Sequence, residues 1–317
     1  MAGEFDLIAR YFDRGPSRSA LLGIGDDCAL IAPPEPGQVM AVTTDMLLAD
    51  RHFFSADPAE AVGHKALAVN LSDLAAMGAS PAFFTLAIAL PEADETWVAA
   101  FARGMFSLAD QHGCELIGGD TTRGPLSISI TAMGWLPHGT ALRRDAAELG
   151  DDIWVSGELG AAALAVGQAL AGQRLPDGHP AMARMLRPSP RVDLGLALRH
   201  LARAAIDVSD GLLADLGHVV QRSRAGADVH WALIPVDSAL TNESVASRQT
   251  LALSGGDDYE LLFTAAPENR PAIEAIGPRL GLRLSRIGTI RPGTGVRVLG
   301  ERGQPLSIAR GGFDHFA

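Results

Sequence analysis

Cysteine is scarce in this chain, whose 317 residues contain only Cys28 and Cys114. So few thiols exclude a disulfide-stapled secreted scaffold and a metal site built from several cysteines. Each cysteine lies beside an apolar run, which favours two buried thiols over a disulfide or a catalytic nucleophile.

Positive charge is also in short supply, with 26 Lys and Arg against 37 Asp and Glu and a net charge of −11. A nucleic-acid binder would normally carry a basic patch. A phosphate substrate is not excluded, because Mg²⁺ can supply positive charge. No apolar run approaches about eighteen residues, and the opening residues MAGEFDLIARYF lack the apolar core of a secretory signal. We therefore expect a cytoplasmic protein with no membrane or nucleic-acid partner.

Several familiar catalytic motifs are missing. The sequence has no P-loop of the form G-x-x-x-x-G-K-[ST], no protein-kinase HRD or DFG set, and no convincing G-x-G-x-x-G after a strand. His52 and His64 are not spaced as metal ligands with other His or Cys residues. Ser156, in VSGELG, is not in a G-x-S-x-G nucleophile elbow. Any phosphate chemistry must therefore use a different arrangement.

Acidic residues beside Gly, Thr or Ser recur at the ends of apolar runs. The segments that contain them are GIGDDCALI, VTTDM, NLSDLAAMGA, LIGGDTTRG and DVSDGLLADL. Clustered carboxylates repel one another unless cations neutralise them, and oxygen ligands without Cys or His indicate Mg²⁺. We place five carboxylates in one proposed metal cluster: Asp27, Asp45, Asp73, Asp120 and Asp207. The alternative for each is a turn or N-cap aspartate.

Neighbouring residues add possible ligands. Thr43 and Thr44 can offer hydroxyl or carbonyl oxygens, or can be ordinary strand threonines. Asn70 precedes Asp73 by three residues and so shares its helix face. The glycines of LIGGD can bring backbone N–H groups to a phosphate. Arg144 can clamp a phosphate, or can be an exposed arginine without such a role.

Alternating strand and helix patterns in both halves predict a two-domain α/β protein, divided as residues 1–138 and 139–317. We expect strands at 38–44 (ending at Asp45), 82–90, 114–117 and 126–136 in the first half. Further strands are expected within 150–160 and at 205–208, 228–233, 261–264, 284–290 and 296–299. Helices are expected at 58–77, 94–112, 159–171, 192–204 and 271–280, with another capped by Ser209 or Asp210. Residues 173–191 look like an exposed connection.

The motifs also resemble a known family. GIGDDCALI, VTTDMLLADRHF, KALAVNLSDLAAMGA, LIGGDTTRG, DVSDGLLADL, SGGDDYELLF and GGFDHF occur in the order seen in the thiamine-monophosphate kinase family, from about Asp6 to Phe316. The resemblance implies a PurM-like architecture, that of the aminoimidazole ribonucleotide synthetase superfamily, with an N-terminal sheet that pairs across a homodimer. It also implies transfer of the γ-phosphoryl group of ATP to thiamine phosphate, which gives thiamine diphosphate.

The resemblance assigns roles residue by residue. Mg²⁺ ligands would be Asp27, Thr43, Thr44, Asp45, Asp73, Asp120, Asp207 and Asp210. ATP contacts would be Gly119, Asp120, Arg144 and Ser209. Contacts to thiamine phosphate would be His52, Glu260 and Phe313, with Glu260 on the aminopyrimidine and Phe313 stacked on a ring. No catalytic base is expected, because the acceptor phosphate is already anionic and phosphoryl transfer depends on positioning and charge neutralisation.

The dimer expectation concerns the strand at 126–136. Leu126, Ile128, Ile130, Ala132 and Gly134 would face the helices of the same domain. Ser127, Ser129, Thr131 and Met133 would face a second copy, or water if the protein is a monomer.

Three other functions are alternatives. A hydrogenase-maturation relative typically ends in a reactive cysteine, but this chain ends in HFA. Selenophosphate synthetase typically uses an N-terminal Cys or selenocysteine with a nearby Lys, and the first 27 residues contain neither Cys nor Lys. A nucleotide sensor that binds Mg²⁺ and ATP without turnover is distinguished by an activity assay.

Overall fold

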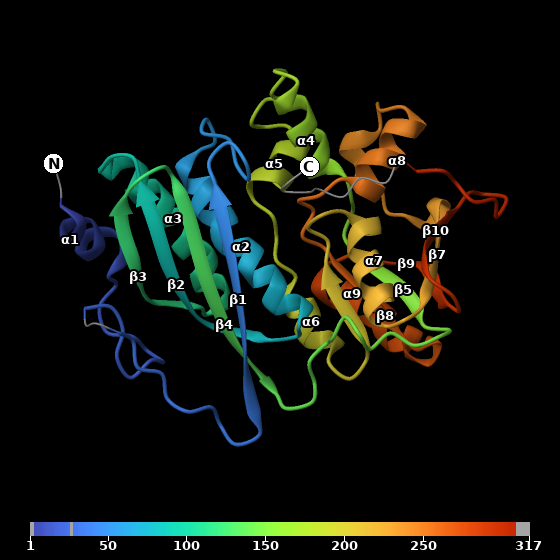
Figure 1. The fold of residues 1–317 in the computed structure, drawn as a ribbon, viewed down its shortest axis with the longest axis horizontal. Coiled ribbons are helices and arrows are strands. Elements are labelled where there is room, and N and C mark those ends of the chain that lie inside the picture. The colour runs from blue at the N-terminus through green and yellow to red at the C-terminus, as the bar shows by residue number, and fades with distance from the viewer. Residues whose placement is uncertain (1–2, 26–27, 309–317) are drawn as a thin grey trace. The chain divides into compact units, whose positions relative to one another are not determined.

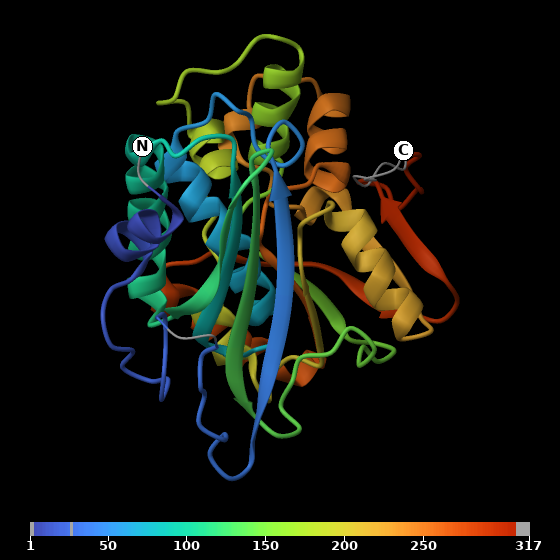
Figure 2. The ribbon, with the colours of Figure 1, turned by 60° about the vertical axis from the view of Figure 1, so that its left-hand side comes forward.

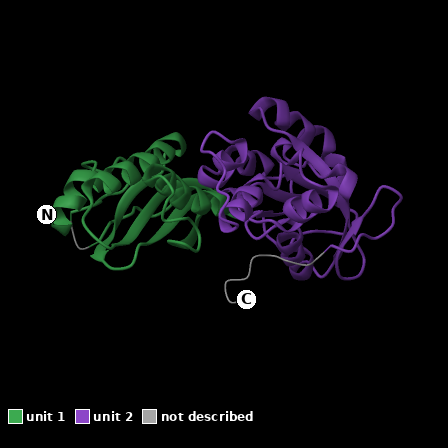
Figure 3. Cartoon of the chain, turned by 90° about the horizontal axis from the view of Figure 1, so that it is seen from above, with its two compact units in different colours: residues 1–74, 79–139 green, residues 75–78, 140–317 purple. Residues whose placement is uncertain are grey.

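A computed structural model describes residues 3–25 and 28–308 of the protein. The chain divides into two compact units, coloured in Figure 3. Unit 1 comprises residues 1–74 and 79–139, and unit 2 comprises residues 75–78 and 140–317. In the described ranges, no helix is long and apolar enough to cross a membrane.

Unit 1 is a four-stranded sheet with two long helices on one face (Figures 1 and 2). The strands lie in the order β1-β4-β2-β3, and only β2 and β3 pair in parallel. Their bounds are β1 (Gln38–Leu48), β2 (Ser80–Leu90), β3 (Glu115–Arg123) and β4 (Ser127–Pro137). The helices are α1 (Glu4–Leu7), the π-helix η1 (Ile8–Phe12), α2 (Ala59–Ala76) and α3 (Glu95–His112).

The strand β4 has the alternation that its sequence predicts. Ile128, Ile130 and Ala132 are at most 1% exposed, whereas the intervening residues are only half-buried. This period of two is typical of a sheet that packs one face on helices. On the paired strand β1, Val42 is 60% exposed and Met46 is 59% exposed. The second face of the sheet therefore presents apolar side chains that unit 1 does not bury.

Local signals fix the ends of α3. The Asp94 side chain accepts hydrogen bonds from the backbone N–H groups of Thr96 and Trp97, as an N-cap residue does. Gly113 ends the helix in the left-handed conformation. These signals lie next to the helix in sequence, which explains why its bounds are predictable to within a residue.

Unit 2 is a six-stranded mixed sheet in the order β10-β7-β9-β5-β8-β6. Its strands are β5 (Asp152–Ser156), β6 (Ala204–Asp207), β7 (Gly226–His230), β8 (Leu261–Ala265), β9 (Leu284–Arg291) and β10 (Gly295–Leu299). Its helices are α4 (Ala161–Leu170), α5 (Pro180–Leu186), α6 (Val192–Leu198), α7 (Leu212–Arg222), α8 (Val245–Ser254) and α9 (Arg270–Leu280). Short 3-10 turns are η2 (Trp231–Leu233), η3 (Ser238–Leu240) and η4 (Pro267–Asn269).

The main core of unit 2 lies between one face of this sheet and the helices α7 and α8. Ile153 and Val155 of β5 belong to it, together with Leu212 and Leu216 of α7 and Leu253 of α8. All five side chains are 0% exposed. Each fully buried side chain of this kind contributes about 1.5–3 kcal/mol of transfer free energy.

Several elements differ from the sequence prediction. The first strand continues past Asp45 to Leu48, because its partner β4 begins at Ser127, which pairs with Leu48. The strand at 114–117 continues through the GGD triplet to Arg123, paired with β2. The segment 173–191 is not only a connection, since it contains α5. The helix predicted at 192–204 ends at Leu198, and α8 was not predicted.

Two local predictions were wrong in detail. Neither Ser209 nor Asp210 caps α7, whose N-cap residue is Gly211 without a side-chain bond. Cys114 is a buried free thiol, as expected, and burial raises its pKa to about 12. Cys28 is also free but exposed, because the apolar residues around it do not enter the core: Leu30 is 50% exposed.

Candidate active site

A pair of carboxylates lies between the sheet and the helix α2 in unit 1. Asp45 is on β1, and its backbone N–H donates to Asn70 Oδ1 over 3.1 Å. Asp73 lies one helical turn after Asn70 on α2, and its Oδ2 accepts a hydrogen bond from the hydroxyl of Thr43. The predicted i,i+3 spacing thus brings Asn70 and Asp73 to the same strand. We call Asp45 and Asp73 the carboxylate pair, and Thr43 is the threonine that contacts it.

The electrostatics of this pair favour a bound cation. Burial, and secondly the neighbouring Asp73 carboxylate, raise the pKa of Asp45 to about 6. Two like charges in a poorly solvated place disfavour ionisation unless a cation compensates them. Their donors are all oxygen atoms, which is the ligand chemistry that Mg²⁺ prefers. The residues present therefore fit a magnesium ion.

Thr44 and Asp120 lie on the other face of the same sheet. Thr44 pairs with Thr131, and the two hydroxyls are 2.8 Å apart. Asp120 of β3 pairs with Ala87 of β2, and Ala87 pairs with Ser129 of β4. Paired residues share a face of the sheet, so Asp120 lies on the same face as the half-buried Ser129. Asp120 itself is exposed. Unit 1 thus brings Asp45 and Asp73 together and does not place the Asp120 side chain beside them.

Gly119 is required by the packing of the sheet. Its φ is +152°, and a Cβ there would lie 1.8 Å from the carbonyl oxygen of Leu86 on β2. A Cβ on Gly118, in contrast, would meet no atom within 4 Å. A side chain at Gly119 would therefore separate β2 from β3. This accounts for Gly119 of LIGGD without a phosphate.

His52 lies in a tight turn that follows β1. Its Nδ1 accepts a hydrogen bond of 2.9 Å from the backbone N–H of Leu48. A neutral imidazole with Nδ1 as acceptor carries its proton on Nε2. The carbonyl of His52 accepts a 3.1 Å bond from Nζ of Lys65, the single lysine of the sequence, which is 5% exposed. The turn thus holds His52 in one tautomer, suited to donate from Nε2.

In unit 2, the sequence DVSDG forms a loop between β6 and α7. Asp207, 4% exposed, ends β6. The carboxylate of Asp215, one turn into α7, accepts the backbone N–H groups of Ser209, Asp210 and Gly211 at 3.0–3.1 Å. Burial, with a smaller contribution from Asp210, raises the pKa of Asp215 to about 7. Asp215, which sequence reasoning did not single out, therefore shapes the loop that carries three predicted ligands.

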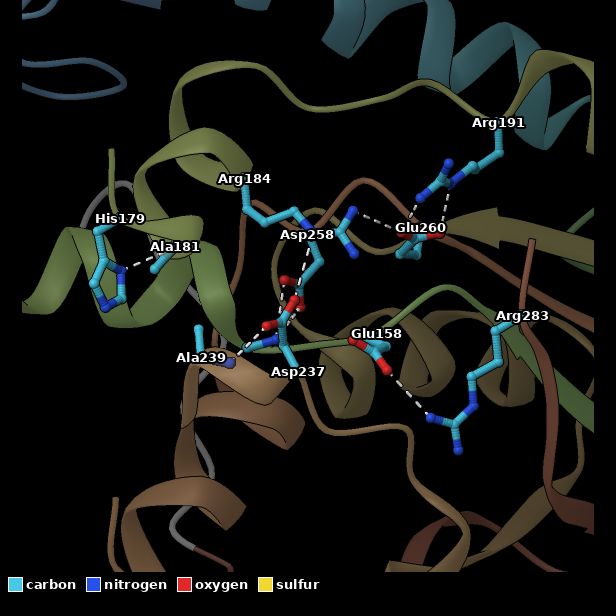
Figure 4. Close-up of polar contacts among 11 residues, drawn as sticks. Glu158, His179, Ala181, Arg184, Arg191, Asp237, Ala239, Asp258, Glu260 and Arg283 are labelled. Atoms are coloured by element: carbon cyan, nitrogen blue, oxygen red, sulfur yellow. Dashed lines mark hydrogen bonds and ion pairs between the residues drawn. The ribbon is translucent and has the colours of Figure 1, made fainter. Parts of the chain in front are cut away.

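Glu260 is the centre of a buried ionic network shown in Figure 4. It is 1% exposed and accepts two hydrogen bonds from Arg191, Nε to Oε2 at 2.7 Å and Nη2 to Oε1 at 2.5 Å. Ser156 Oγ donates to Oε2 at 2.5 Å. Arg184 Nη1 lies 3.5 Å from Oε1. We call Glu260, Arg191, Ser156 and Arg184 the Glu260 network. Sequence reasoning missed its arginines, because nothing local links them to Glu260.

The remaining predicted residues are placed as follows. Arg144 is exposed, and its carbonyl accepts the hydroxyl of Ser223 at 3.0 Å. Asp27 and Phe313 lie outside the described residues. Within residues 3–25 and 28–308, no three His, Cys, Asp or Glu side chains gather as a metal site.

Comparisons with known proteins show the family to which the chain belongs. Residues 25–136 match the family "AIR synthase related protein, N-terminal domain", and residues 148–301 match its C-terminal domain. The thiamine-monophosphate kinase of Salmonella typhimurium (strain LT2) is 48% identical to this chain over an alignment of 325 positions. The alignment covers 99% of this chain and 98% of that protein.

Two solved structures extend the match. The thiamine-monophosphate kinase of Stenotrophomonas maltophilia K279a is 51% identical with a TM-score of 0.85, over 95% of each chain. A structure described as AaThiL complexed with AMPPCP and TMP is 30% identical with a TM-score of 0.78, over 99% of this chain and 97% of that one. This chain therefore belongs to the thiamine-monophosphate kinase family.

Proposed function

We propose that this protein transfers the γ-phosphoryl group of ATP to thiamine phosphate and so forms thiamine diphosphate. The observation that carries the proposal is the carboxylate pair Asp45 and Asp73, whose oxygen donors and raised Asp45 pKa suit a divalent cation. Full-length relatives are named for this activity. The AaThiL structure, with an ATP analogue and TMP, supports the pairing of the two substrates.

Magnesium would be held by Asp45 and Asp73 with Thr43, and further ions by Thr44, Asp27, Asp120, Asp207 and Asp210. When bound, Mg²⁺ supplies the positive charge that lets two anionic phosphates approach each other. The residues of the chain hold the proposed ligands in place. Asp215 holds the loop of Ser209 and Asp210 for the nucleotide, and Asn70 holds the backbone of Asp45. Gly119, Asp120 and Arg144 are the other proposed ATP contacts.

On the acceptor side, His52, Glu260 and Phe313 would contact thiamine phosphate. His52 can donate from Nε2 because its Nδ1 already accepts the N–H of Leu48. No residue needs to act as a base, since the attacking oxygen belongs to a phosphate that is anionic at neutral pH. The direct test is to incubate the protein with ATP, Mg²⁺ and thiamine phosphate and to measure thiamine diphosphate by chromatography. A protein that binds ATP but forms no product would instead be a nucleotide sensor.

We expect a strict preference for thiamine phosphate over free thiamine. A primary alcohol needs a base to remove its proton, whereas the phosphate acceptor does not. We expect kcat/KM for thiamine to be lower by at least about 1,000-fold, in the range that general-base catalysis spans. The measurement is steady-state kinetics with both acceptors at saturating ATP and Mg²⁺. Comparable kcat/KM values would contradict the mechanism and require a search for that base.

We also propose that the protein is a homodimer that pairs through the open face of the unit 1 sheet. The exposed Val42 and Met46 beside the small hydroxyls of β4 support this pairing. We expect a dimeric mass by light scattering at low micromolar concentration and an unfolding midpoint that falls on dilution. An obligate interface of this kind buries more than about 2,000 Å².

A matched pair of variants tests which face is used. Met46→Glu is expected to give a monomer, because the charge would be buried in the interface. Leu170→Glu, at a position in α4 that is 75% exposed, is the control and should leave the mass unchanged. A monomeric wild type with a concentration-independent midpoint would rule the dimer out.

A further inference from the structure

The acceptor sites of Glu260 are already full. An ionised carboxylate offers about four lone-pair positions, two on each oxygen. Oε2 accepts from Arg191 Nε and Ser156 Oγ, and Oε1 accepts from Arg191 Nη2 and faces Arg184 Nη1. Any new donor that reaches Glu260 must therefore displace one of these four. Under the proposed function such a donor exists, namely the amino group of the aminopyrimidine.

Three of the four donors are held firmly. Arg191 binds both oxygens at 2.5 and 2.7 Å, in the bidentate geometry that makes arginine–carboxylate pairs strong. Ser156 is fully buried, and its oxygen also accepts the backbone N–H of Leu261 at 2.9 Å. Releasing any of these would leave a buried polar group without its partner, which costs about 1–3 kcal/mol.

Arg184 differs from them in three respects. Its distance of 3.5 Å to Oε1 is at the limit of a hydrogen bond. Its side chain is 32% exposed. It also has a second carboxylate, since its Nε lies 3.5 Å from Oδ2 of Asp237, whose side chain is 8% exposed. Figure 4 draws the guanidinium linked to both Asp237 and Glu260. Arg184 can therefore leave Glu260 and remain paired.

We propose that Arg184 is an exchangeable positioning residue: it occupies Oε1 of Glu260 when thiamine phosphate is absent and gives this place to the amino group of the aminopyrimidine. Asp237 retains the displaced guanidinium. This inference rests on the proposed function of Glu260. Arg184 then competes with the substrate, which is the opposite of what an arginine that bound the substrate phosphate would do.

The experiment compares KM values for thiamine phosphate at saturating ATP. Arg184→Met removes the competitor, so KM should fall about threefold or more, within what one weak charged contact provides. Asp237→Asn removes the carboxylate that lies 3.5 Å from Arg184 and leaves the weaker interaction with Asp258, so Arg184 should hold Glu260 more tightly and KM should rise by a similar factor. The double variant should behave like Arg184→Met. KM for ATP should change little in all three variants, whereas a merely structural role would change KM for both substrates.

Glu260→Gln separates this inference from the function itself. If wild-type protein forms no thiamine diphosphate, the proposed function is wrong. If it turns over but Glu260→Gln leaves KM unchanged, the role of Glu260 is wrong. If Glu260→Gln raises KM while Arg184→Met also raises it or leaves it unchanged, the exchange is overturned. Should Arg184→Met not fold, Asp237→Asn decides the question, and an unchanged or lower KM there overturns the exchange.

Discussion

Replacing Asp45 by asparagine is expected to abolish phosphoryl transfer and, in the same variant, to make the magnesium-free protein more stable above pH 6. Turnover should fall by more than about 100-fold, because the substitution removes a charged ligand of the proposed magnesium site. Stability should rise because asparagine does not ionise. In the wild type, burial and Asp73 hold the pKa of Asp45 at about 6, above its unfolded value near 4.

The sign of the pH dependence follows from linkage. A carboxyl whose pKa is raised by folding contributes its full stability below the unfolded pKa and loses it as pH rises through the folded one. The wild type should therefore lose stability between about pH 4 and pH 6, by at most about 3 kcal/mol. Asp45→Asn should not show this loss, so the two proteins should differ most above pH 6 and least near pH 4.

The measurement is urea unfolding in EDTA across pH 4–8, together with turnover assays in Mg²⁺. Magnesium should stabilise the wild type and have less effect on the variant. Near-wild-type activity of Asp45→Asn at limiting Mg²⁺ would show that Asp45 is not a ligand of the proposed metal site. Asp120→Asn is the companion variant. We expect it to lose turnover without the gain in stability, because Asp120 is exposed on the other face of the sheet.

Gly157→Ala is the second substitution with a large expected effect. Gly157 has a φ of +60°, and a Cβ at this position would lie 2.0 Å from Oε1 of Glu260. The buried carboxylate would have to move, which breaks its bidentate pair with Arg191. Breaking a buried ion pair of this kind costs about 3–5 kcal/mol. We also expect KM for thiamine phosphate to rise at least tenfold, while KM for ATP changes little.

Gly281→Ala is the matched control. Gly281 has the same φ of +60°, but a Cβ there meets no atom within 4 Å. It should cost only the strain of alanine in the left-handed region, about 1–2 kcal/mol, and leave KM unchanged. Chemical denaturation of both variants measures the difference. If they lose equal stability, the contact with Glu260 has no role and backbone strain explains both.

The parts of the site that sequence reasoning predicts depend on short-range periodicity. Asn70 and Asp73 share a helix face because three residues make almost one turn, and the structure places both against β1. The alternation of β4 likewise identified its buried face. Such patterns depend on neighbours in the chain, so one sequence contains enough information to find them.

Other parts depend on pairings that a single sequence does not reveal. Both faces of β1 carry apolar residues, so its pattern does not indicate which of Thr44 and Asp45 meets the helix. The need for Gly119 comes from a carbonyl on β2, and not from a turn. Glu260 lies 69 residues from Arg191 and 104 from Ser156 along the chain. Contacts at this separation are fixed by the tertiary fold.

The burial of Lys65 has a consequence for chemical labelling. Its ε-amine is enclosed and bonded to the carbonyl of His52, and the chain has no other lysine. Acylation at this site requires the turn around His52 to open locally, so its rate measures a local opening equilibrium in the sense used for hydrogen exchange. A mass spectrometer can follow this one modified peptide over time. Acylation of Lys65 therefore reports the local opening of the turn that contains His52, a proposed substrate contact.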